Sequence, residues 1–225
     1  MVALLAVGVG AVMVTGAVAD AGADPLAGCP AGSVVTGGTG PAMEVVDGEI
    51  RLGPPPAVDG QARLELSTTA VHRGGAAVDL TVMGTVAPAR DTVVTVRRQV
   101  VETAQRIAGG AEQSWCFRQA PGGAGDLVVR VSAYVAMAKR GGVVQAYPSV
   151  DAADGNHPDG VPLIYPKVLQ ALYHHGTWVD SAGRRSPVTA QYVDGGVELT
   201  VPGSLLAETT FPATLDPEII VTPAS

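Results

Sequence analysis

Aromatic residues are scarce in this chain of 225 residues. Phe, Trp and Tyr together make up 4% of it, although 47% of the residues are hydrophobic. A buried core must therefore be built mainly from small and β-branched side chains, and β-branched residues favour strands because they pack well on a pleated surface. The length suffices for one large all-β unit or for two smaller ones.

Clusters of positive charge are also missing. The formal net charge is −7, and Arg97-Arg98 and Arg184-Arg185 are isolated pairs. We interpret these pairs as solvated turns or strand ends. A phosphate backbone demands clustered Lys and Arg, so the composition argues against a nucleic-acid partner.

Cysteine occurs only twice, as Cys29 and Cys116. This rules out the CxxC and Cys/His clusters of a structural zinc site. In an exported chain the two are expected to form a disulfide, worth roughly 4 to 5 kcal/mol in the chain-entropy model. Leu26-Ala27-Gly28-Cys29 also resembles the lipobox of bacterial lipoproteins, so a lipidated Cys29 is one alternative and unpaired thiols are another. Asp20 and Asp24 separate the apolar run from Cys29, which favours the disulfide.

The chain begins with a continuous apolar run over residues 1–19. The run ends in Ala17-Val18-Ala19 and is followed by Asp20, which is typical of a secretory signal peptide, although no Lys or Arg precedes it. We expect a signal segment over 1–23 and a secreted or cell-surface protein. The alternative is an uncleaved anchor, because the run is just short of the roughly 20 residues of a spanning helix. Membrane attachment is expected only through that anchor or a lipidated Cys29.

Residues 24–60 are rich in Gly and Pro, with Pro54-Pro55-Pro56 as the clearest run. Such a stretch is typical of a linker or a loosely attached arm. Within it, residues 43–52 are expected to form one short hairpin around Asp47-Gly48.

Alternating apolar and polar residues predict strands through the rest of the chain. The expected strands cover residues 62–67, 78–83, 127–132, 188–193, 197–201 and 219–221. The stretch 90–107 carries both helical spacing and many β-branched residues, and we favour strand. Asp180 to Gly183 and Asp194 to Gly196 are turn signals, and residues 203–208 are expected to hold one helical turn.

These features predict an all-β fold, an antiparallel β-sandwich preceded by the signal segment and the Gly/Pro-rich arm. The strands form either one sandwich or two packed β subdomains. In the second arrangement the units are residues 61–150 and 161–225, joined by a loop over 151–160.

The two tryptophans, Trp115 and Trp178, are interpreted as core anchors because large aromatics dominate burial where aromatics are few. A platform on which sugars stack is the alternative. The two-residue period of a strand places Trp115 and Phe117 on one face and Cys116 on the other.

One loop could hold a metal. Asp151, Asp154, Asn156 and Asp159 supply oxygen atoms around a glycine, and calcium takes roughly six to eight of them. The spacing does not match an EF-hand, and a solvated loop is the competing interpretation. We expect no cofactor, with calcium at this loop as the single exception.

No recognisable catalytic constellation is present. His174 and His175 precede Asp180, but neighbouring strand residues point to opposite faces and do not easily share an ion. The serines Ser181, Ser186 and Ser204 lack nucleophile-elbow glycines and an evident base. No catalytic residue is assigned.

Several separated motifs resemble an uncharacterised amino-terminal module of large secreted bacterial proteins, across roughly residues 64–220. They are Glu-Gln-Ser-Trp at 112–115, Pro-Gly-Gly-Ala-Gly-Asp-Leu at 121–127, Tyr-His-His-Gly-Thr-Trp-Val-Asp at 173–180 and Phe-Pro-Ala-Thr-Leu-Asp-Pro at 211–217. That module is typically followed by β-propeller-like, FG-GAP or YD-type repeats. The resemblance implies such repeats as partners in a longer protein; it supplies no catalytic residues, and Cys116 is not part of the module's pattern.

The expected function is therefore that of a non-enzymatic exported or cell-surface module, a structural cap or adhesion-type spacer. The first alternative is a β-sandwich that binds glycan or another surface ligand with the help of calcium. The second is a hydrolase with an unrecognised site.

Overall fold

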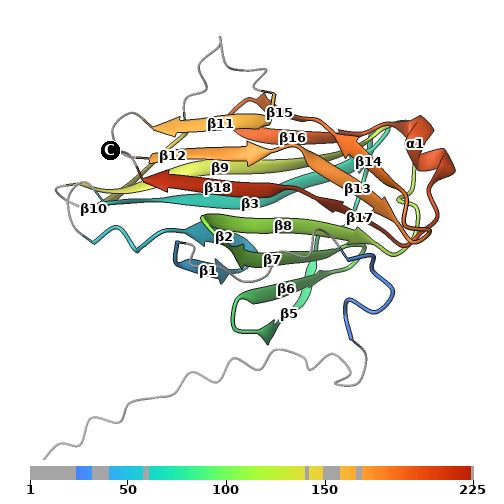
Figure 1. Ribbon diagram of the computed structural model, residues 1–225, viewed down its shortest axis with the longest axis horizontal. Helices are drawn as coiled ribbons and strands as arrows, with labels where there is room; N and C mark the ends of the chain where they lie inside the picture. The colour runs from blue at the N-terminus through green and yellow to red at the C-terminus, as the bar shows by residue number, and fades with distance from the viewer. Residues whose placement is uncertain are drawn as a thin grey trace, which may run out of the picture.

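The computed structural model describes residues 24–31, 41–57, 61–139, 142–148, 158–165 and 169–223. The expected signal segment, residues 1–23, lies outside the described residues. Strands dominate the described chain, and they assemble into two antiparallel sheets that pack as a sandwich (Figure 1). The predicted fold class, an all-β antiparallel sandwich, is confirmed.

The first sheet, sheet A, is built around two long neighbouring strands, β3 and β9. Its strands, in spatial order, are β1 (Met43–Val46), β2 (Glu49–Leu52), β3 (Ala62–Arg73), β9 (Leu127–Lys139), β16 (Gly196–Val201) and β15 (Ala190–Val193). Two short strands extend it, since β4 (Ala76–Ala77) pairs with β3 and β10 (Gly142–Ala146) pairs with β9.

The second sheet, sheet B, is organised around β8. Its path runs through β11 (Gly160–Tyr165), β12 (Leu169–His174), β18 (Glu218–Pro223), β8 (Gly110–Phe117), β17 (Ala213–Asp216), β13 (Gly176–Asp180) and β14 (Arg185–Val188). Both β17 and β18 pair with β8. From β8 the sheet continues through β7 (Val101–Ile107) and β6 (Thr92–Arg97) to β5 (Val82–Ala89). The helix α1 (Gly203–Glu208) lies at one end of the sandwich (Figure 1).

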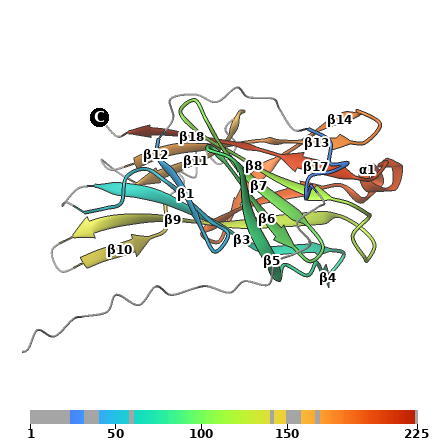
Figure 2. The same ribbon diagram turned by 90° about the horizontal axis from the view of Figure 1, so that it is seen from below.

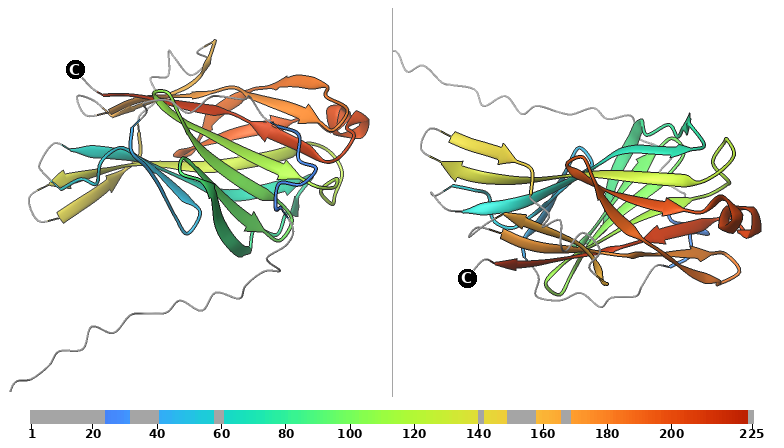
Figure 3. Two further views of the ribbon diagram at one scale, coloured as in Figure 1. Left: turned by 60° about the horizontal axis from the view of Figure 1, so that its bottom comes forward. Right: turned by 90° about the horizontal axis from the view of Figure 1, so that it is seen from above.

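Strands from both halves of the chain pair with each other in both sheets. In sheet A, β9 pairs with β16, and in sheet B, β8 pairs with β17 and β18. Figures 2 and 3 show the resulting layers from other directions. The ranges 61–150 and 161–225 therefore interleave in one two-layer arrangement.

The core between the sheets is mainly aliphatic, as the composition predicts. It holds residues such as Leu64, Val129 and Leu199, and Trp115 and Trp178 are both buried in it. The interpretation of the tryptophans as core anchors is confirmed. Neither is a surface platform for sugars.

The predicted faces of β8 are also confirmed. Trp115 and Phe117 belong to the core between the sheets, whereas Cys116 lies in a second cluster with Val94 and Val101. We call the side of sheet B that carries Cys116 its outer face.

Local turn chemistry is confirmed at two hairpins. Asp47 and Gly48 join β1 to β2 with φ of 51° and 81°, and Asp194 and Gly195 join β15 to β16 with φ of 42° and 82°. Two consecutive left-handed residues match the twist of the flanking strands. The expected helical turn is α1, and the stretch 90–107 forms β6 and β7.

Two predicted strands differ from the structure. The strand expected at 78–83 begins only at Val82, because the Asp79 side chain accepts a hydrogen bond from the Thr81 N–H at 2.9 Å and so forms a local turn. The strand expected at 188–193 is split at Thr189, where the chain leaves sheet B as β14 and enters sheet A as β15.

Replacement of Trp178 by Ala is expected to lower the free energy of unfolding by about 3 to 5 kcal/mol. The side chain is 1% exposed, its indole N–H donates to Thr209 Oγ1 at 3.0 Å, and its ring centroid lies 5.8 Å from that of Phe117. Denaturant titration of Trp178→Ala, with Trp178→Phe as the milder variant, measures the loss. An unchanged midpoint for the Ala variant would contradict this packing.

Candidate functional site

The two cysteines form a disulfide, with their Cα atoms 5.9 Å apart. This bond fixes residues 24–31, drawn in blue in Figure 1, against the outer face of sheet B. Leu26 and Cys29 pack there on the cluster around Cys116. Two hydrogen bonds hold the same segment, from Arg118 to the Pro25 carbonyl at 2.8 Å and from Thr214 Oγ1 to the Pro30 carbonyl at 3.1 Å. The structure thus pairs Cys29 with Cys116 as predicted.

Most of the proposed calcium loop falls outside the described residues, which include neither Asp151, Asp154 nor Asn156. Asp159 is described and exposed, and its backbone carbonyl accepts a hydrogen bond from the His175 N–H at 3.1 Å. No group of three or more His, Cys, Asp or Glu suited to a metal occurs in the described ranges. Calcium binding at this loop stays a prediction.

The histidines and serines singled out from the sequence lie in separate places. His174 ends β12, while His175 Nδ1 accepts a hydrogen bond from the Ala190 N–H at 3.1 Å and so links the two sheets. The Ser181 hydroxyl donates to the Thr210 carbonyl at 2.9 Å, Ser186 lies on β14 and Ser204 lies on α1. The polar contacts of His175 and Ser181 hold backbone segments in place.

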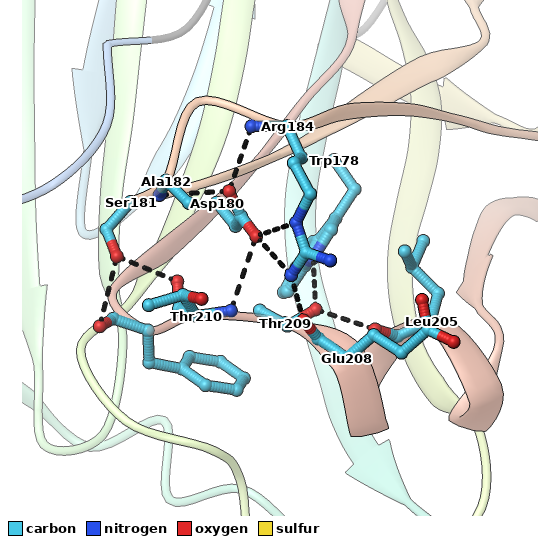
Figure 4. A network of polar contacts seen from close by, with 10 residues as sticks. Trp178, Asp180, Ser181, Ala182, Arg184, Leu205, Glu208, Thr209 and Thr210 are labelled. Carbon is cyan, nitrogen blue, oxygen red and sulfur yellow. Dashed lines mark hydrogen bonds and ion pairs between the residues drawn. The ribbon is translucent and has the colours of Figure 1, made fainter.

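Asp180 anchors one end of the sandwich (Figure 4). Its Oδ1 accepts hydrogen bonds from the N–H groups of Ala182 at 3.0 Å and Arg184 at 2.9 Å, and its Oδ2 accepts from Arg184 Nε at 2.8 Å and from the Thr210 N–H at 3.3 Å. Burial opposes ionisation, but these hydrogen bonds outweigh it and lower the pKa of Asp180. The carboxylate ties the β13–β14 turn to the segment that follows α1.

A second polar network lies between the sheets, around Glu102. This carboxylate accepts from Thr68 Oγ1 at 2.7 Å and Gln113 Nε2 at 2.8 Å, and it pairs with Arg97 at 2.7 Å. The Tyr173 hydroxyl donates to Gln113 Oε1 at 3.1 Å. Burial and the charge of Glu102 raise the pKa of Tyr173 well above its usual value. Every member is held by another, which indicates a structural role.

Two buried carboxyl groups meet on the outer face of sheet B, an arrangement that sequence reasoning missed. Glu112 on β8 is 6% exposed and Asp216 on β17 is 4% exposed. Burial, the neighbouring Asp216 and the charge of Glu218 raise the pKa of Glu112 to about 8. Glu112 therefore keeps its proton at neutral pH, beside a second carboxyl group. Asp216 lies far from Glu112 in sequence; each belongs to one of the separated motifs at 112–115 and 211–217, but their spacing carries no sign that the two carboxyl groups meet.

A pair of tyrosines, of which Tyr134 is half-buried and Tyr147 is exposed, marks the outer face of sheet A. The ring centroids of Tyr134 and Tyr147 lie 4.8 Å apart and their hydroxyls 3.2 Å apart, and Tyr147 is 57% exposed. Directly across from Tyr134 on β3 is Glu65, which accepts hydrogen bonds from Gln145 at 2.7 Å and Arg63 at 2.8 Å. Aromatic ring faces thus stand beside fixed polar groups. We call this set the tyrosine face.

Glu112→Gln is expected to change how stability depends on pH. In the native chain Glu112 keeps its proton up to about pH 8, whereas in the unfolded chain it loses the proton above about pH 4.5. The free energy of unfolding should therefore fall as the pH rises from about 4.5 to about 8, by up to about 5 kcal/mol. The amide cannot ionise, so the variant should lose this slope and exceed the parent in stability above pH 8.

Urea titrations at pH 5, 7 and 9 measure the effect of Glu112→Gln. Glu208→Gln, which makes the same charge change at an exposed side chain, is the matched control. Parallel pH profiles for the Glu112 variant and the parent would show that Glu112 ionises normally in the fold.

No helix of the described residues is long and apolar enough to span a membrane. No protein-family model matches the chain, and neither the curated proteins nor the solved structures include a protein similar enough to count as a match.

Proposed function

We propose that this chain is a non-enzymatic, disulfide-stapled β-sandwich module of an exported or cell-surface protein, serving as a structural cap or adhesion-type spacer. The observation that carries the proposal is the Cys29–Cys116 disulfide, which pins residues 24–31 to sheet B. Disulfides persist in oxidising compartments and are rare in reducing ones.

The place of the disulfide in the fold supports this view. Seven of the eight residues of β8 are buried, so the strand needs cover on both of its faces. Sheet A covers one face, and the segment held by Cys29 contributes to the cover of the other. The bond joins residues 87 positions apart, and closing such a loop is worth roughly 4 to 5 kcal/mol in the chain-entropy model.

The motifs noted in the sequence give the proposal its biological setting. They resemble the amino-terminal module of large secreted bacterial proteins, in which repeats follow the module. The repeats of a longer chain would then be the partners that this sandwich caps.

Intact mass of the protein exported from a bacterial host tests the proposal. We expect a mass that begins at Asp20 or Asp24, with both cysteines protected from alkylation until they are reduced. A mass beginning at Cys29 with added acyl chains would contradict the disulfide and make the protein a membrane-tethered lipoprotein. Free thiols in the exported protein would also count against it.

Glycan binding is the second candidate, and the tyrosine face favours it. Tyrosine rings bury apolar surface while their hydroxyls stay in water, which suits the faces and edges of sugar rings. The exposed amide of Gln145 lies next to the pair and offers both a donor and an acceptor, and the buried Glu65 holds it in place. This site lies on the outer face of sheet A.

Tyr147→Ala is expected to abolish or weaken binding to a glycan at least tenfold, since stacked aromatic side chains carry much of such binding energy. Affinity electrophoresis in gels that contain soluble β-glucan, xylan or galactomannan measures glycan binding by the parent and the variant, once with calcium and once with EDTA. Met83→Ala, an exposed change on the other sheet, is the control. Equal retardation of Tyr147→Ala and Met83→Ala would exclude glycan binding at the tyrosine face. Absence of retardation of the parent protein by all three glycans would exclude it as well.

A further inference from the structure

A cavity of about 410 Å³ opens on the outer face of sheet B, beside the disulfide. Its lining residues come from β5, from the end of β6 through the turn into β7, and from the chain just after β8; they are Met83, Val96, Arg97, Arg98, Gln99, Val100, Val101, Arg118 and Gln119. Val96 and Val101 also pack on the cluster around Cys116. The volume lies within the roughly 300 to 1,000 Å³ of ligand pockets.

The cavity is positively charged in a chain whose net charge is −7. Three arginines line it, and none of the lining residues is acidic. Arg97 is committed to Glu102 between the sheets, at 2.7 Å. Arg98 is 60% exposed and pairs with Asp79 at the surface, at 3.0 Å. Arg118 is exposed and holds the Pro25 carbonyl.

Arg98 comes from the turn between β6 and β7 and Arg118 from the chain just after β8, and each can offer to a ligand the guanidinium N–H groups that do not bond Asp79 or Pro25. Guanidinium binds carboxylate through charge-assisted and often paired hydrogen bonds. Between them the floor is apolar, formed by Val96, Val101 and Met83. A matching ligand carries a carboxylate next to an apolar group.

The neighbouring strand β5 indicates that this ligand is an extended peptide. Among the described strands β5 pairs only with β6, and it exposes Val82, Met83 and Val86. Met83 belongs both to this open edge and to the cavity. The Arg98 N–H donates to the Thr81 carbonyl at 3.0 Å, which fixes Arg98 next to the start of β5. An extended peptide that pairs with this edge antiparallel to β5 would have its carboxy-terminus beside the start of β5, and therefore beside Arg98.

Only a short part of the edge is usable. Pro88 has no N–H to donate, and the register between β5 and β6 shifts between Val86 and Ala89. The register also shifts between Val82 and Gly84, where Met83 lines the cavity. Regular pairing with β6 therefore covers only Gly84 to Val86, so few peptide residues can pair with β5.

We propose that this cavity binds the free carboxy-terminus of an extended peptide whose last side chain is apolar. The carboxylate lies between Arg98 and Arg118, and the last side chain rests on Val96 and Val101. The Gln119 amide at the rim can bond the peptide backbone. This inference goes beyond the proposed function and does not depend on export.

Fluorescence anisotropy with a labelled pentapeptide, Thr-Thr-Val-Thr-Val, tests the proposal in two forms, the free acid and its carboxy-terminal amide. We expect the free acid to bind and the amide to bind at least tenfold more weakly. Arg98→Gln and Arg118→Gln should each weaken the free acid roughly tenfold to a hundredfold, because each removes charge-assisted hydrogen bonds. Arg185→Gln, an exposed arginine on β14, should leave affinity unchanged.

Arg98→Gln alters an exposed side chain, so its melting temperature should match that of the parent. Arg118→Gln also removes the hydrogen bond to the Pro25 carbonyl, so its binding is compared with that of the parent at a temperature where circular dichroism shows both proteins folded. Equal binding of acid and amide, or unchanged binding by Arg118→Gln, would overturn the proposal. Absence of binding by either peptide would do the same. Decanoate is a further probe, and its binding without that of the free-acid peptide would assign the cavity to fatty carboxylates instead.

Discussion

The buried carboxylate of Glu102 is the constraint on which the packing of both sheets depends. A charge between two sheets costs several kcal/mol unless it is paired and fully hydrogen-bonded. Arg97 and Gln113 from sheet B supply part of that compensation, and Thr68 from sheet A supplies the rest. Because the partners come from both layers, the sheets can satisfy Glu102 in only one relative position. The network therefore fixes how the sandwich closes, while the aliphatic core supplies most of the burial.

Thr68 reaches that network at a bulge in β3. Leu64 and Leu66 face the core before it, whereas Val71 faces the core after it, so the inward positions change from even to odd numbers. Alternation in the sequence predicts the first part of this strand but not its continuation beyond the bulge. The Asp-Gly hairpins are predictable, because their left-handed residues are a local requirement. The split at Thr189 is not, since it depends on which sheet each half joins.

The candidate sites divide in the same way. With two cysteines in the chain, the sequence predicts the pairing of Cys29 with Cys116 as one of three states, beside a lipidated Cys29 and unpaired thiols, and the structure shows the pair. Glu112 meets Asp216, and Arg98 shares a cavity with Arg118, only because strand pairing brings separate segments together. Although Glu112 and Asp216 lie in two of the motifs noted above, neither pair has a fixed spacing in the sequence, so a single sequence carries no sign that its members meet. The tyrosine face is similar, because its polar groups come from β3 and β10 as well as β9.

Arg118 connects the disulfide-bound segment, residues 24–31, with the proposed peptide site. Its guanidinium donates to the Pro25 carbonyl, within the segment that Cys29 ties down, and it also lines the cavity. Val101 has a similar double role, packing on the disulfide cluster and forming the floor. The position of the arm thus helps to set the shape of the cavity and the direction of one of its two cations. A ligand there would bind best to the oxidised form, because the disulfide holds in place the segment to which Arg118 is bonded.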